Sequence, residues 1–276
     1  MNIEQYLNNL DDDIQILVIA RQNLTELPDL RRFNKLKELD IVNNNITGIL
    51  DITSNVTDNL MRLSCFNNQI TEIKNLPSKL ERLDCSQNLL SKLDNLPSDL
   101  KYLNISFNNF SILPNLPNTL KTLHCHNNQL KNISSLPNEL HNFTCFNNQI
   151  EEIYSLPDSL DFIYCGNNLL KDLPNIPDKL SLLNFDNNQI KRLSMNINPN
   201  LTIYCENNPI LFDNINECIQ FNKFRKTYYV HKYGRRLEKY FLNFIKKRKM
   251  DFHNELLYSP DLPFYKQKWN ILQNYI

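Results

Sequence analysis

One pattern, Leu-x-x-Leu-x-Cys-x-x-Asn-x-Ile/Leu, returns every 20 residues over most of this 276-residue chain. It begins at Leu60, Leu80, Leu100, Leu120, Leu140, Leu160 and Leu180, and once more at Asn200. A fixed short period is typical of a solenoid, in which each repeat forms one coil that packs against its neighbours. The period therefore predicts a stacked fold, and it favours recognition by a broad surface over catalysis in a pocket.

The repeat that starts at Leu80 shows how one coil is built. Leu83 and Cys85 alternate with Arg82 and Asp84, the period of two that indicates a strand with one buried face. Leucine then returns at three positions that we expect to point inward: Leu90, Leu93 and Leu96. Proline follows at 77, 97, 117, 137, 157 and 177, and proline disfavours helix at the residue before it. We therefore expect a parallel sheet on one side of each coil and an extended or 3₁₀ return limb on the other.

Asparagine occupies the turn after the strand in nine coils: Asn44, Asn68, Asn88, Asn108, Asn128, Asn148, Asn168, Asn188 and Asn208. The first coil carries Gln22 at this place. A carboxamide both donates and accepts hydrogen bonds, so it can satisfy backbone groups of its own coil and of the adjacent one. These asparagines are predicted to be structural.

Six cysteines share a single inward position of the repeat: Cys65, Cys85, Cys125, Cys145, Cys165 and Cys205. Ile105 and Phe185 stand at the same position in other coils, which indicates that the thiols serve as small core side chains. Their 20-residue spacing fits neither a zinc site nor the disulfide framework of a small secreted domain. We expect reduced, buried thiols, no metal and no cofactor.

The repeat can be followed towards the N-terminus as far as Ile14, which gives ten repeats over residues 14–210. The segments before and after them do not follow the repeat. Residues 2–12 are amphipathic at helical spacing, so residues 1–13 are predicted to form an N-terminal helical cap. Residues 211–276 carry 13 Lys+Arg against 6 Asp+Glu, whereas residues 1–210 carry 17 against 24. Helical spacing over 214–230 and 235–250 predicts that this basic segment is a helical C-terminal cap.

Residues 80–90, Leu-Glu-Arg-Leu-Asp-Cys-Ser-Gln-Asn-Leu-Leu, resemble the consensus of the leucine-rich-repeat family. The 20-residue length, with Leu-Pro on the return limb, looks like the short subtype of bacterial effectors. The asparagine-rich composition and the tail also resemble uncharacterised leucine-rich-repeat proteins of giant amoeba-infecting DNA viruses. The resemblance implies an α/β solenoid with a concave parallel sheet that is used mostly to bind proteins. The ubiquitin-ligase domain of some bacterial relatives is not expected, because 66 residues after the repeats are too few for it.

The sequence offers little for catalysis. It has no Ser-His-Asp set, no zinc motif and only three glycines, too few for a phosphate-binding loop. His124 and His126 are two apart on a predicted strand; we expect surface imidazoles there, with a metal site as the alternative. An enzyme site would have to be built where the solenoid meets its cap. The chain also shows neither an apolar run of bilayer length nor the features of a signal peptide, so we expect an intracellular, cytoplasmic protein that does not contact a membrane.

Because the repeated Leu, Cys, Asn and Pro positions are structural, we expect a partner to bind at the outward strand positions. Aromatic and arginine side chains are frequent interface anchors, and they gather here at Arg62, Phe66, Arg82, Tyr102, Phe146, Phe162, Tyr164 and Tyr204, together with His124. The alternative is that these rings simply pack on one another across strands. Towards the N-terminus the same face is apolar, with Ile16, Val18 and Val42. We predict a non-enzymatic scaffold that binds a protein or peptide on its concave face, with its oligomeric state left open.

A second hypothesis uses the basic segment. Lys246, Lys247, Arg248 and Lys249 form a run that could contact nucleic acid. Cations near the C-terminal end of a helix explain the same run without a ligand, because they oppose the negative end of the helix dipole.

Overall fold

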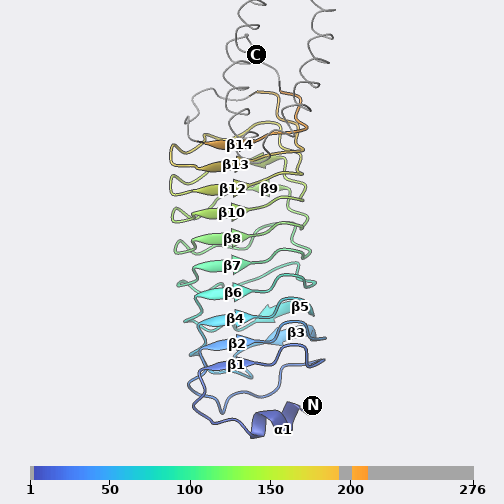
Figure 1. Cartoon of the computed structure of the whole chain (residues 1–276), viewed down its shortest axis with the longest axis vertical. Helices are drawn as coiled ribbons and strands as arrows, with labels where there is room; N and C mark the ends of the chain where they lie inside the picture. Colours follow the sequence, from blue (N-terminus) through green and yellow to red (C-terminus); the bar gives the residue numbers. More distant parts are fainter. Residues whose placement is uncertain (1–2, 193–200, 211–276) are drawn as a thin grey trace, which may run out of the picture. The chain divides into compact units, whose positions relative to one another are not determined.

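The computed structural model describes residues 3–192 and 201–210, and the described coils stack into a single column (Figure 1). Each coil contributes one short strand to a ten-stranded sheet in which every pair is parallel. In spatial order the strands are β1 (Ile16–Val18), β2 (Glu38–Asp40), β4 (Arg62–Ser64), β6 (Arg82–Asp84), β7 (Tyr102–Asn104), β8 (Thr122–His124), β10 (Asn142–Thr144), β12 (Phe162–Tyr164), β13 (Leu182–Asn184) and β14 (Thr202–Tyr204). The predicted solenoid with a parallel sheet is confirmed.

Strand register follows the sequence repeat. Leu63 lies beside Leu83, and Leu83 beside Leu103, so that each repeat position forms a row along the column. Leu83 and Cys85 are fully buried, as are their counterparts in the neighbouring coils. Burying a leucine side chain contributes about 1.5–3 kcal/mol, and here each coil needs its neighbours to complete that burial. The rows therefore explain why this sequence is stable only as an array.

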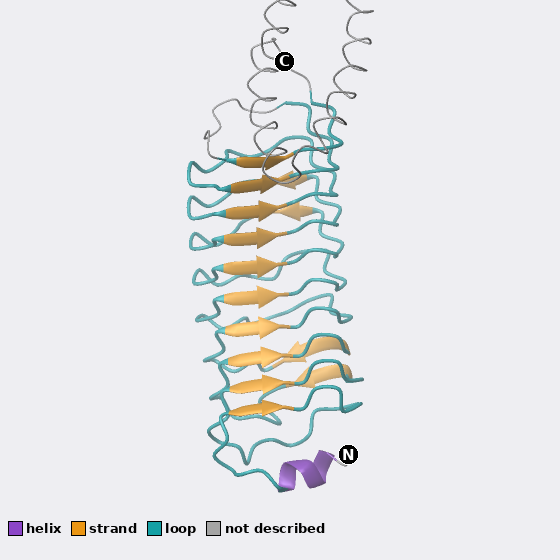
Figure 2. Ribbon diagram, in the orientation of Figure 1, coloured by secondary structure: helices purple, strands orange, loops and turns teal. Residues whose placement is uncertain are grey.

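The return limb is extended, as the prolines predict. It contains two small parallel sheets, β3 (Thr47–Asp51) with β5 (Gln69–Lys74) and β9 (Asn132–Ile133) with β11 (Glu152–Ile153) (Figure 2). Within the described residues no 3₁₀ helix occurs. One expectation was wrong in detail: Leu96 is only half-buried, whereas Pro97 is buried. The pyrrolidine ring takes the inward place because it is apolar and carries no amide hydrogen that would need a partner.

The asparagine ladder holds the turns together. The Nδ2 of Asn88 donates to the carbonyl oxygens of Cys85 in its own coil and Cys65 in the preceding coil, both at 3.1 Å. Its Oδ1 accepts from the backbone amide of Ile70 at 3.0 Å. The same set of bonds recurs at Asn108, which confirms the predicted bridge between coils. A buried carboxamide so fully bonded fixes both the turn and the spacing of the strands.

The residue before Gln22 and before each ladder asparagine adopts the left-handed backbone conformation. Its φ lies between 53° and 57° at Arg21, Asn43, Asn67, Gln87, Phe107, Asn127, Asn147, Asn167, Asn187 and Asn207. Asparagine tolerates this region better than other residues with a side chain. The Asn-Asn pairs of the sequence therefore have two separate causes, hydrogen bonding at the second residue and backbone geometry at the first.

The N-terminal segment forms helix α1 (Ile3–Asn8), shorter than the predicted 2–12. Leu7 is buried, and the guanidinium of Arg32 donates to the carbonyl oxygens of Leu7 and Leu10. These contacts tie the end of α1 to the return limb of the first coil. The described residues include no helix that is long and apolar enough to cross a bilayer. The C-terminal helical cap predicted for 211–276 lies outside the described residues.

Candidate interaction surface

The outward side of the ten-stranded sheet carries the nine residues predicted to bind a partner. Seven of them lie on strands between β4 and β14 (Figure 1), whereas Phe66 and Phe146 are the second residues after β4 and β10. At the N-terminal end, Ile16 and Val18 are exposed by 60% and 54%, as expected for outward residues. Val42 is buried instead, so its prediction as part of the solvent face was wrong. Its amide bonds to Asp40 two residues before, which turns the chain at this point.

A continuous chain of contacts crosses the middle of the sheet. The guanidinium of Arg82 lies 3.5 Å from the ring centroid of Tyr102. Tyr102 meets His124 edge to face, with 5.5 Å between ring centroids. The Nδ1 of His124 is hydrogen-bonded to the hydroxyl of Thr144 at 2.8 Å. Three of the predicted residues are thus brought together across adjacent strands, and rings held by neighbours on both sides lose little freedom when a partner binds.

A hollow of about 280 Å³ opens on the sheet directly beyond His124. It is lined by residues of β8, β10 and β12: Thr122, His124, Asn142, Phe143, Thr144, Phe162 and Tyr164. Phe143 is fully buried and forms the floor, whereas Phe162 is 41% exposed. Aromatic walls around a few hydroxyl and amide groups are the usual composition of a site that accepts one side chain or a small ligand.

A second aromatic stack lies just past the ends of the same strands. His126 stacks on Phe146 with 4.2 Å between centroids and 8° between planes, and Phe107 meets His126 edge to face at 5.3 Å. Burial, with a smaller contribution from His124, lowers the pKa of His126 to about 4. Burial also lowers the pKa of His124, with Asp84 opposing the shift and Arg82 adding to it. Both imidazoles are therefore neutral at pH 7.

No charged side chain interrupts this part of the face. We call it the uncharged band, defined as the outward residues of β7, β8, β10 and β12 with the second residue after each strand: Tyr102, Asn104, Ser106, Thr122, His124, His126, Asn142, Thr144, Phe146, Phe162, Tyr164 and Gly166. On one side it is bordered by Arg82 and Asp84 of the coil of β6, on the other by Leu182, Asn184 and Asp186 of the coil of β13. Asp84 accepts bonds from Asn104 and from Ser86, so its carboxylate is already partnered.

Other predicted residues do not join the band. Arg62 is ion-paired with Glu38 on the neighbouring strand β2. Phe66 is half-buried in the coil of β4, and Tyr204 lies two strands beyond Tyr164. Sequence reasoning did not single out Phe107, which the structure places in the second aromatic stack. The available signal was that phenylalanine stands there in place of the asparagine found in most other coils. The basic run Lys246–Lys249 lies outside the described residues.

The six described cysteines are buried and form no disulfide among themselves, which confirms their predicted place in the core. Burial raises the pKa of the Cys165 thiol to about 12 and those of Cys65 and Cys125 further. The reactive form of cysteine is the thiolate, so these groups do not act as nucleophiles. Within residues 3–192 and 201–210, no three His, Cys, Asp or Glu side chains are placed to hold a metal ion.

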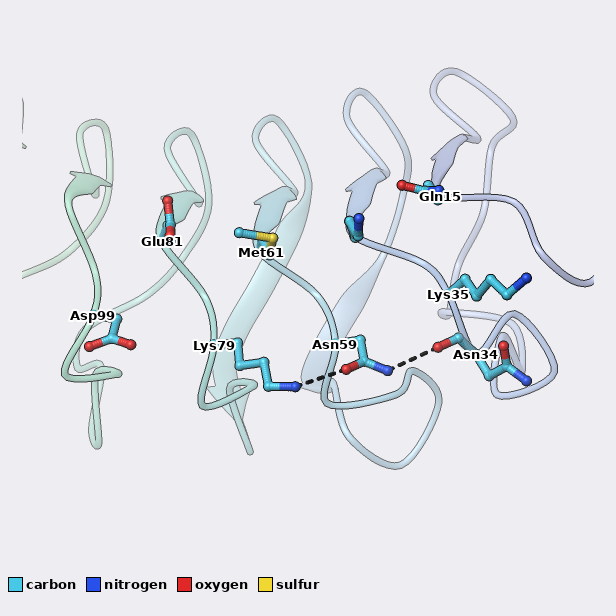
Figure 3. Close-up of a pocket in the computed structure, with 9 residues that line it drawn as sticks. Gln15, Asn34, Lys35, Asn59, Met61, Lys79, Glu81 and Asp99 are labelled. Atoms are coloured by element: carbon cyan, nitrogen blue, oxygen red, sulfur yellow. Dashed lines mark hydrogen bonds between the residues drawn. The ribbon is translucent and has the colours of Figure 1, made fainter.

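A second recess follows the edge of the sheet where the strands begin. It measures about 510 Å³ and is lined by Gln15, Asn34, Lys35, Lys37, Asn59, Met61, Lys79, Glu81 and Asp99 (Figure 3). Lys79 donates to the side chain of Asn59, which in turn donates to the carbonyl oxygen of Asn34. Lys35 is paired with Asp13 at 3.2 Å. Three lysines and two carboxylates line the recess, so it holds charges of both signs.

Comparison of the sequence with protein-family models and with curated proteins gives no match. Solved structures do match. YopM from Yersinia pestis, described as a leucine-rich effector protein, superposes with a TM-score of 0.67 and 28% identity, over 73% of this chain and 56% of its own. YopM from Yersinia enterocolitica WA-314 gives 0.61 and 24%, over 75% and 54%. The leucine-rich repeat domain of LRIM1 gives 0.63 and 18%, over 78% and 73%.

These structural neighbours are leucine-rich repeat proteins, and the column of coils described above is a leucine-rich-repeat solenoid. The chain spans only a little more than half the length of the two YopM chains.

Proposed function

We propose that the protein is a non-enzymatic scaffold that binds another protein or a peptide on the outward side of its ten-stranded sheet, within the uncharged band. The observation that carries this proposal is the hollow beside His124, whose aromatic walls Phe162 and Tyr164 stand on a backbone fixed by the asparagine ladder. Exposed rings on a rigid support lose little entropy on binding.

Two further observations support a polypeptide partner. The band spans four strands, roughly 15 Å at a spacing of about 4.8 Å, which matches about five residues of extended chain. Among the structural neighbours, LRIM1 is seen in a complex with APL1C. The described cysteines are buried and form no disulfide among themselves, which fits a reducing compartment and favours a partner inside the cell.

Two tyrosines offer a matched test. Tyr164 lines the hollow, whereas Tyr154 is 59% exposed on the return limb just after β11. The partner would be identified by affinity capture and mass spectrometry, and its dissociation constant measured with purified proteins. Tyr164→Ala should weaken binding at least tenfold, the loss typical of an anchor residue, while Tyr154→Ala should leave it unchanged. Equal losses, or none from Tyr164→Ala in a folded protein, would reject the sheet face as the site.

The alternative proposal is a nucleic-acid-associated protein that uses the basic segment 211–276, and only the excess of Lys and Arg there supports it. It predicts binding to generic DNA or RNA that weakens steeply with added salt, because each phosphate contact releases a counterion. Deleting residues 235–276 should abolish that binding. Salt-independent binding, or binding that survives the deletion, would remove this alternative.

A further inference from the structure

Phe107 occupies a backbone position that suits asparagine and that accommodates an aromatic residue poorly. Its φ is 54°, and the equivalent residue is asparagine in most described coils, with φ between 53° and 55°. The left-handed region places the Cβ of an L-residue close to the following carbonyl oxygen, and a bulky side chain there is an outlier. Local strain of this kind points to a function when no packing gain explains it.

The side chain of Phe107 is 47% exposed, so only about half of it gains from burial. It also interrupts a second, exposed row of asparagines. Asn147 donates to the Oδ1 of Asn127 at 2.9 Å, and Asn167 donates to Asn147 at 2.8 Å. At Asn127 the row stops, because the preceding coil offers a ring instead of a carboxamide, and its Nδ2 bonds to His126 at 2.8 Å. Phenylalanine therefore costs both a favourable conformation and a side-chain hydrogen bond.

In exchange, the ring completes an aromatic stack on the edge of the uncharged band. Phe107, His126 and Phe146 form a row of three rings, and Phe107 is the exposed end of that row. Ser106 precedes it in the chain, Gln87 and Asn127 stand at the same repeat position in the adjacent coils, and none of these three residues carries a charge. A charged group placed here by a partner would lose its water and find no opposite charge, which is costly. The surroundings therefore select an uncharged, apolar side chain.

We propose that Phe107 is an anchor of the binding surface, and that it holds an aliphatic or aromatic side chain of an uncharged, extended segment of the partner polypeptide. This inference rests on the proposed function and adds a residue and a partner chemistry to it. The strained conformation persists because the exposed ring is needed for binding.

Gln87 provides the matched control. It stands at the same repeat position one coil earlier, with φ 54°, and is exposed outside the uncharged band. Phe107→Asn and Gln87→Asn both restore asparagine at a left-handed position. Phe107→Asn should raise the melting temperature by about 2–4 °C, the shift expected for removing strain of this size in a domain of this length. Gln87→Asn should raise it by a smaller amount.

Binding would be measured with short random peptides displayed in a library and selected on the wild-type protein. The selected peptides should be rich in apolar residues and poor in charged ones. Phe107→Asn should weaken their binding about tenfold or more, and Gln87→Asn should leave it unchanged. A more stable protein that binds less well is the combination expected of a functional residue kept at a cost to the fold.

Three results would overturn the inference. Phe107→Asn could lower the melting temperature, which would make the ring a structural residue. It could stabilise the protein and leave binding within twofold of the wild type. The selected peptides could require a charged residue. If Tyr164→Ala abolishes binding while Phe107→Asn does not, only this inference fails. If no peptide binds the wild type, or if Tyr164→Ala has no effect, the proposed function fails as well.

Discussion

Inward and outward residues of the same three-residue strands obey different rules. On β8, Leu123 is fully buried and has leucine beside it on β7, whereas Thr122 and His124 face outward and are flanked by different residues on each neighbouring strand. The inward rows vary little because every coil must fit the one before it. The outward rows are free of that constraint, so their residues can change to fit a binding partner while the fold stays the same. Substitutions at inward and outward positions should therefore differ in their effect on the free energy of unfolding.

The largest effect is expected in the core. Leu103→Ala should destabilise the protein by about 2–5 kcal/mol, because it removes buried contacts and leaves a cavity between two coils. Its outward neighbour Tyr102 contacts Arg82 and His124 only at the surface, so Tyr102→Ala should cost about 1 kcal/mol. Urea denaturation followed by circular dichroism measures both. Comparable losses for the two variants would contradict the division between inward and outward residues.

The asparagine ladder should come next. Asn108→Ala removes the acceptor for the amide of Leu90 and the donor to the carbonyl oxygens of Cys85 and Ile105. Leaving such buried groups unbonded should cost about 2–3 kcal/mol. The adjacent, exposed Asn109 is a matched control, and Asn109→Ala should change the free energy of unfolding by less than about 0.5 kcal/mol. Equal effects would mean that the ladder does not hold the coils together.

Gly166 tests how closely coils approach at the edge of the band. A Cβ added there would meet the side-chain oxygen of Asn184 at 2.8 Å and the carbonyl oxygen of Asp186 at 3.1 Å. Gly166→Ala should therefore cost about 1–3 kcal/mol, measured by thermal unfolding. Gly166→Ala combined with Asn184→Ala should recover part of that loss, because the nearest clash is removed. No loss in the single variant would show that the coils have room to move apart.

The smallest effect concerns pH. Because the folded-state pKa of His126 is about 4 against an ordinary value of 6.5, the folded protein binds fewer protons than the unfolded chain between these values. Its contribution to stability should be complete above pH 6.5 and decrease as the pH falls towards 4. His126→Phe keeps a ring on Phe146 but cannot titrate, so it should lose less stability over this interval. A nuclear magnetic resonance titration placing the pKa of His126 above 6 would contradict this expectation.

The sequence alone predicts the scaffold well, for a physical reason. Strand position, burial of the cysteines and the bonds of the interior asparagines all follow from rules that act within one repeat and its neighbour. Errors occurred where two groups compete for one place. Pro97 takes the inward place expected for Leu96, and Val42, at the end of the apolar N-terminal face, is buried.

The candidate site could be predicted only in part. Alternation shows that His124, Phe162 and Tyr164 face outward, but not that they surround one hollow, since that depends on rotamers and on Thr144 between them. The sequence shows that Phe107 replaces an asparagine, but not that its backbone is left-handed. That backbone conformation, which is unfavourable for phenylalanine, is visible only in the structure.

Photo-crosslinking tests the central claim most directly. The photoreactive residue p-benzoylphenylalanine would replace Thr122, which lines the hollow, or Tyr154 on the return limb, and the protein would be irradiated with its captured partner. If the uncharged band binds the partner, the adduct should form from position 122 and not from position 154. An adduct from position 154 alone would contradict the account, because the partner would then bind the return limb rather than the sheet.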